Sequence, residues 1–82
     1  MPIQVLAAVY GTNNAGIDVT AICQNLVSNG NDDIPVNNDS MQGDPDPGAT
    51  KSFGILYSLD GAQKLALTAT EGQTLDLIAH PA

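Results

Sequence analysis

The chain has 82 residues and a formal net charge of −7, because nine acidic residues face only two lysines. This charge excludes a surface that neutralises nucleic-acid phosphates, and it disfavours binding to anionic membranes. The length allows a single domain, residues 1–82, and no apolar run approaches the roughly 20 residues of a membrane-spanning helix. Because so short a chain buries a modest core, we expect a homo-oligomer, a dimer or larger.

Cysteine use and the amino terminus indicate the cellular compartment. Cys23 is the single cysteine, so an intrachain disulfide or a cysteine-based zinc site cannot form. We expect Cys23 to be a small buried side chain. The sequence starts Met1-Pro2 and enters an apolar run without the basic segment of a secretory signal, which predicts a cytoplasmic protein.

The first part of the chain predicts a hairpin. Residues 3–10 are apolar at both odd and even positions, which is typical of a strand covered on both faces. Residues 11–16 are rich in Gly and Asn and predict a turn. Ile17 and Val19 then predict a short second strand that returns beside the first.

A short helix is expected next, over residues 21–28. Thr20 is placed to act as its N-cap, and apolar residues follow at helical spacing. Asn29-Gly30 supplies the signal that ends a helix. The apolar stripe of this helix would cover one face of the sheet.

The segment 31–43 is the least regular part of the chain. Ile34-Pro35-Val36 predicts a brief edge strand, because proline removes one ladder hydrogen bond. Five of the nine acidic residues fall between positions 32 and 46, so this region concentrates the polar side chains.

A second hairpin follows, and it is the strongest local signal in the sequence. Over 52–59, one face of the predicted strand carries Phe53, Ile55, Tyr57 and Leu59, and the other carries Ser52, Gly54, Leu56 and Ser58. Asp60-Gly61 predicts a two-residue type I′ turn, and 64–68 runs back. Residues 74–78 predict a last strand, and His80 lies in a tail. The predicted fold is mainly β: a small antiparallel β-sandwich, or a sheet of five to six strands, with one short α-helix.

Catalytic groups are scarce. The only histidine, His80, is the third residue from the end of the sequence, where order is least expected. Asp32-Asp33 could supply paired carboxylates, but adjacent loop aspartates are usually solvated charge. The segment 43–48 carries aspartates where a phosphate cradle needs donors and positive charge. We therefore predict no catalytic residues and no enzyme activity.

Calcium is a possible ligand of the acidic region, since carboxylate and amide oxygens are the ligands it prefers. The window that starts at Asn29 has Asn31 and Asp33 in step with an EF-hand loop but lacks the central Gly and the terminal Glu. A set of acidic turns with capped backbone groups explains the same residues without a metal, so no metal ligand and no obligatory cofactor are assigned.

A glycan or another small polar ligand is the preferred partner. Asn and Asp side chains on loops that a rigid sheet positions can read sugar hydroxyls, although Tyr10 and Tyr57 lie within strand patterns and are expected in the core. The candidate binding residues are Asn13, Asn14, Asn31, Asp32, Asp33, Asn37, Asn38, Asp39, Asp44 and Asp46.

Three segments read together give a family resemblance. They are Ile17-Asp18-Val19-Thr20, Leu26-Val27-Ser28-Asn29-Gly30, and the run from Gly43-Asp44-Pro45-Asp46-Pro47-Gly48 to the strand that ends in Tyr57. Over residues 17–78 the chain resembles the C-terminal β-rich domain of a DnaJ-type mitochondrial co-chaperone and similar small stand-alone proteins of fungi. The resemblance implies a β-domain for binding or assembly and brings no catalytic residues. The chain departs from that family in lacking a J-domain and in its Asn/Asp-rich insert, 31–42.

The sequence thus predicts a non-catalytic binding protein with lectin-like recognition of a glycan. Two alternatives stay open: a protein-interaction or self-assembly module that uses an exposed sheet edge, and a calcium-stabilised structural protein.

Overall fold

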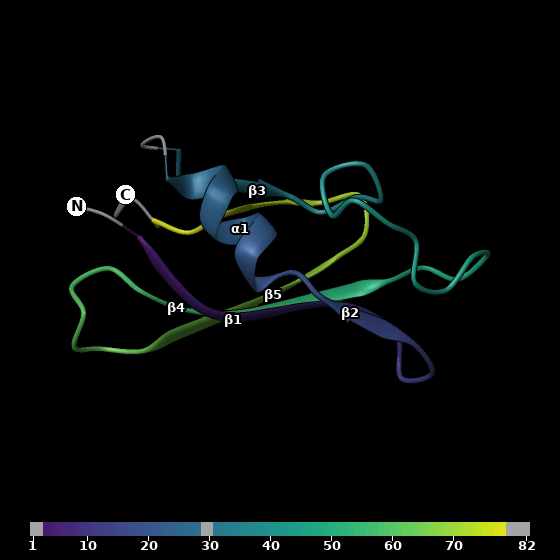
Figure 1. Cartoon of the computed structure of the whole chain (residues 1–82), viewed down its shortest axis with the longest axis horizontal. Helices are drawn as coiled ribbons and strands as arrows, with labels where there is room; N and C mark the ends of the chain where they lie inside the picture. The colour runs from purple at the N-terminus through teal and green to yellow at the C-terminus, as the bar shows by residue number, and fades with distance from the viewer. Residues whose placement is uncertain (1–2, 29–30, 79–82) are drawn as a thin grey trace.

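The computed structural model describes residues 3–28 and 31–78 as two packed layers (Figure 1). One layer is an antiparallel sheet of four strands in the order β2-β1-β4-β5, and the other contains helix α1 and the two-stranded sheet β3-β6. The elements are β1 (Gln4–Gly11), β2 (Gly16–Asp18), α1 (Thr20–Val27), β3 (Asp33–Pro35), β4 (Ser52–Ser58), β5 (Leu65–Thr70) and β6 (Thr74–Asp76). The predicted mainly β fold with one short helix is confirmed.

Three sequence-based expectations concern residues outside this description. The helix-ending signal Asn29-Gly30, the tail histidine His80 and the start Met1-Pro2 lie outside the described residues.

Strand β1 is covered on one face only, which corrects the expected burial on both faces. Val5, Ala8 and Tyr10 are buried, whereas Val9 is 54% exposed. The buried positions change parity because the register with β4 shifts between Val5 and Ala7, as a β-bulge does. The apolar residues at both parities therefore reflect a change of face within one strand.

The hairpin of β4 and β5 is confirmed, with Ile55 opposite Leu67 and Tyr57 opposite Leu65. Its turn is not the predicted two-residue turn, because residues 59–64 form a wider loop. The Asp60 carboxylate accepts hydrogen bonds from the backbone N–H groups of Ala62 and Gln63, both at 2.9 Å. This side-chain capping replaces the backbone pairing that a type I′ turn would need.

Helix α1 begins one residue earlier than expected, and Thr20 is not its N-cap. Val19 occupies that position without a side-chain cap. The Asp18 carboxylate instead accepts the backbone N–H of Thr20 at 2.9 Å and its hydroxyl at 2.6 Å. The Thr20 hydroxyl oxygen accepts the N–H of Ala8 at 2.9 Å, so this side chain joins the helix to β1.

The side chain of Gln24 fastens the same helix to the edge of β1. Its Oε1 accepts the N–H of Val5 at 2.8 Å, and its Nε2 donates to the carbonyl of Ile3 at 3.0 Å. The carboxamide thus bonds to β1 as the peptide group of a neighbouring strand would.

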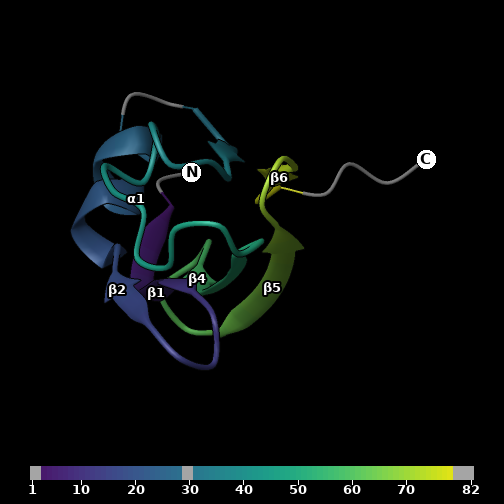
Figure 2. The same cartoon turned by 90° about the vertical axis from the view of Figure 1, so that its right-hand side faces the viewer.

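Figure 2 shows the two layers end-on, and both layers contribute buried residues to one core. From the four-stranded sheet, inward side chains such as Tyr10 and Phe53 are buried, and Cys23 is buried on the helix as expected. Ile34, Met41 and Leu77 close the core from the other side and are each at most 1% exposed. The segment 31–46 is therefore anchored by buried apolar residues between its polar ones.

Candidate functional site

The first polar cluster surrounds a buried lysine. Lys51 directly precedes β4 and is 2% exposed. Its Nζ lies 2.7 Å from Asp44 Oδ1 and 3.4 Å from Glu71 Oε1, and it donates to the main-chain carbonyl of Asp46 at 3.3 Å. The hydrogen bond to Asp44 raises the pKa of the Lys51 ammonium. We call these four residues the lysine cluster, and they fold the acidic turn 44–48 around one cation.

Neighbouring hydrogen bonds extend the lysine cluster into the core. The Thr12 hydroxyl donates to Asp46 Oδ2 at 2.7 Å, and the Tyr10 hydroxyl donates to Asn38 Oδ1 at 2.7 Å. Burial raises the pKa of Tyr10, so its hydroxyl stays a donor at neutral pH. Asn37 Oδ1 accepts a backbone N–H within the same loop. These candidate residues hold the loop in place by internal bonds.

The second cluster contains three carboxylates. One oxygen each of Asp32, Asp33 and Asp76 lies within 4.8 Å of the others, and Asp33 and Asp76 are opposite each other in the sheet β3-β6. Partial burial, together with the charges of Asp76 and Asp33, raises the pKa of Asp32. We call these residues the carboxylate cluster. Asp76 was missed from sequence because its proximity depends on the pairing of two strands that are far apart in the chain.

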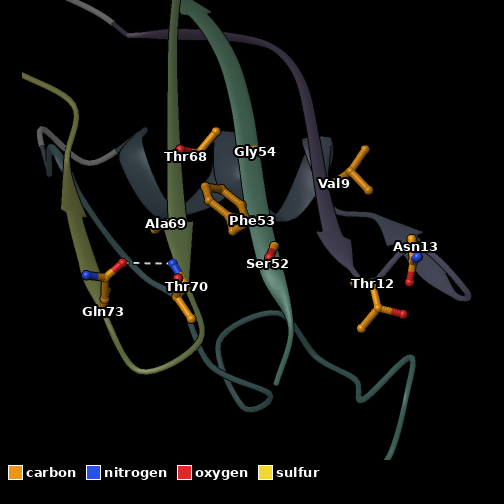
Figure 3. A pocket seen from close by; sticks show the side chains of 11 residues that line it. Val9, Thr12, Asn13, Ser52, Phe53, Gly54, Thr68, Ala69, Thr70 and Gln73 are labelled. Carbon is orange, nitrogen blue, oxygen red and sulfur yellow. Dashed lines mark hydrogen bonds between the residues drawn. The ribbon is translucent and has the colours of Figure 1, made fainter. Parts of the chain in front are cut away.

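A groove of about 590 Å³ lies on the open face of the four-stranded sheet, opposite the helix (Figure 3). Gly54 of β4 lies between Val9 of β1 and Thr68 of β5 in register. A Cβ atom at Gly54 would meet nothing within 4 Å, so the missing side chain leaves the floor of the groove open.

The groove is lined by neutral polar groups. Asn13, Ser52, Thr68 and Thr70 contribute side chains that make no hydrogen bond with another described residue. Gln73 turns its Oε1 to the backbone N–H of Thr70, at 2.7 Å, as Figure 3 shows. None of the described residues that line the groove has a charged side chain, so the lining offers neutral hydrogen-bond donors and acceptors to a ligand.

The other candidate residues are distributed around the molecule. Asn13 reaches the groove and Asn14 is exposed in the same turn. The Asn31 amide donates to the carbonyls of Leu26 and Asp33, at 3.2 and 2.9 Å, and so ties the helix end to β3. Asp39 is exposed. The ten candidates therefore do not form one site: some stabilise the lysine cluster and its loop, two join the carboxylate cluster, and one lines the groove.

Sequence reasoning missed most of the groove. Its hydroxyl residues on β4 and β5 have the composition of ordinary strands, and their grouping depends on the register of three strands. The signal that was available is the small or polar residue at alternate positions of 66–70 and at positions 52 and 54, a pattern that ends at Leu56.

Comparison of the chain with known proteins adds no assignment to this geometry. Among residues 3–28 and 31–78, no helix has the length and apolar character to cross a membrane. No family model, no curated protein and no solved structure matches the chain.

Proposed function

We propose that the protein is a non-catalytic, cytoplasmic binding protein that holds a neutral polar ligand of the glycan class in the groove over Gly54. The observation that carries this proposal is the neutrality of the groove in a chain of net charge −7. Hydroxyl and amide groups without internal partners are suited to exchange hydrogen bonds with sugar hydroxyls. The Val9 side chain gives one apolar wall for the C–H groups of a sugar ring.

The affinity of one groove should be low. Tyr10 and Tyr57 are both buried, so neither offers a ring for stacking. The groove is open to solvent, and its hydrogen bonds must compete with water. A dissociation constant on the order of millimolar is the expected scale for such a site. Display of several grooves on one oligomer would raise the effective affinity.

The proposed ligand site is the groove on the sheet, whereas the sequence predicted a site on the Asn/Asp-rich loops. Asn13 keeps a direct role at the rim of the groove, whereas Asp44 and Asp46 act indirectly by holding the neighbouring loop. The resemblance to the C-terminal β-rich domain of the co-chaperone is compatible with this role, because it also implies binding without catalysis.

Filling the groove tests the proposal. Gly54→Val places a side chain in open space and improves strand propensity, so we expect the free energy of unfolding to rise by roughly 0.5–1 kcal/mol. On a glycan array, followed by NMR titration of the best hit, this variant should lose binding by at least tenfold. Ala66→Val is the control, since it lies on the same face of the sheet outside the groove.

A different outcome would favour the alternative of a protein-interaction or self-assembly module. Binding of no glycan by the wild type, together with self-association in sedimentation, would replace the glycan proposal by this alternative. The specific observation behind it is the edge of β5, described below.

The calcium-stabilised structural role has a test of its own. A calcium-dependent rise in Tm that Asp76→Asn abolishes would support that role, and an unchanged Tm would remove it.

A further inference from the structure

The outer edge of β5 carries backbone groups without partners. The N–H of Glu71 donates to the carbonyl of Lys51 at 2.8 Å, which places the odd-numbered residues of β5 in hydrogen-bonded pairs with β4. The backbone groups of Ala66 and Thr68 therefore point away from β4. Neither residue makes a further backbone hydrogen bond with any described residue.

The other edges of the four-stranded sheet are either hydrogen-bonded to other parts of the protein or very short. Gln24 and Thr20 occupy the outer backbone groups of β1 from the helix. At the far end of β5, Gln73 bonds to both the N–H and the carbonyl of Thr70. Strand β2 is only three residues long and ends at the exposed Asp18, and short charged strands resist pairing. The free edge is thus confined to the first half of β5.

We propose that this edge pairs antiparallel with the β5 edge of a second copy of the chain, so that two four-stranded sheets become one. An antiparallel edge is complementary to itself, because each free residue presents one donor and one acceptor. The half-buried side chains of Leu65 and Leu67 lie along the edge, and pairing would remove more of their surface from water.

Charge also favours a second copy as the occupant. Lys64 directly precedes β5 and is the one exposed basic side chain among the described residues, while Glu71 directly follows β5. Antiparallel pairing brings the basic end of one strand toward the acidic end of the other. The remaining surface is acidic in both copies, so other contacts between copies would be repulsive.

Thr68→Pro tests the edge without removing a bond from the monomer. The N–H of Thr68 does not pair with β4, and proline is tolerated at such positions of an edge strand. The wild type should sediment as a dimer at high concentration, and Thr68→Pro should weaken dimerisation at least tenfold while its circular dichroism stays native. Thr68→Val keeps the N–H and should dimerise like the wild type.

Hydrogen exchange supplies a second test on the unmodified protein. The amides of Ala66 and Thr68 should become protected as the protein concentration rises, whereas those of Leu67 and Ala69 should be protected at every concentration. A chain that stays monomeric, or a dimer in which Ala66 and Thr68 exchange freely, would overturn the proposal. The pairing uses backbone groups of β5, but Thr68 also lines the groove over Gly54. Glycan binding is therefore tested with Gly54→Val and not with the Thr68 variants, so the two proposals can fail independently.

Discussion

The lysine cluster and the carboxylate cluster place different acidic side chains in opposite electrostatic environments. In the lysine cluster, Asp44 and Glu71 flank the buried ammonium of Lys51, so two negative charges share one positive charge. In the carboxylate cluster, Asp32, Asp33 and Asp76 crowd together, and the repulsion between them contributes to the raised pKa of Asp32. We therefore expect the first arrangement to stabilise the fold at neutral pH and the second to oppose it.

The difference shows that acidic composition alone does not define a ligand site. Asp44 and Asp46 belong to one loop and fold it around a single cation. Asp32 and Asp33 meet Asp76 only because β3 pairs with β6. In the lysine cluster, Asp44, Asp46 and Lys51 are close in sequence and only Glu71 comes from a distant part of the chain, whereas the carboxylate cluster requires the pairing of two distant strands.

The largest effect is expected from Lys51→Met. Removing the ammonium leaves two carboxylates beside a buried methylene chain without their counter-ion. Tm should fall by about 10 °C or more, measured by circular dichroism at pH 7. Lys64→Met is the matched control, because Lys64 is exposed and makes no ion pair with a described residue. Equal effects of the two substitutions would show that the lysine cluster has no special role.

Tyr10→Phe, beside the lysine cluster, should destabilise the protein by an intermediate amount. The substitution removes the hydroxyl that donates to Asn38 Oδ1 and leaves the ring in the core. We expect the free energy of unfolding to drop by about 1–2 kcal/mol, measured in urea. No change would mean that water replaces the hydroxyl at Asn38 without loss.

Asp76→Asn should have the smallest effect and the opposite sign. Because the pKa of Asp32 is raised in the folded state, its contribution favours folding below the unfolded pKa and is lost as pH rises through the folded pKa. Removing the neighbouring charge should therefore raise Tm at pH 7, by about 1–3 °C, and hardly change it at pH 3.

The salt dependence of Tm gives a further test of the carboxylate cluster. The gain from Asp76→Asn should shrink in 1 M sodium chloride, since exposed charges are screened. A gain of the same size at pH 3 and pH 7 would contradict the assignment to charge repulsion.

Sequence patterns correctly predicted the elements that depend on residues close together in the chain. The alternation around Phe53 predicted the central hairpin, and the apolar spacing after Thr20 predicted the helix to within one residue at each end. The two-residue turn at Asp60 failed because a side chain bonds to two backbone groups at once, which widens the loop. The burial of β1 failed because a bulge cannot be read from apolar residues at both parities.

The candidate site was less predictable for a related reason. Nothing in the local sequence around Gly54 shows that Val9 and Thr68 lie on either side of it. The sequence predicted that Asn and Asp side chains in the loops bind a ligand. Several of them instead accept hydrogen bonds from backbone or side-chain groups of the protein itself.

The carboxamide of Gln24 also protects the protein against aggregation. Its two bonds hold the helix and shield a strand at the same time. Local unfolding of the helix would expose unpaired backbone groups along the edge of the amino-terminal strand. Strands of other chains could then pair with this edge one after another and form fibrils. Helix attachment in this small protein is therefore also its protection against misassembly.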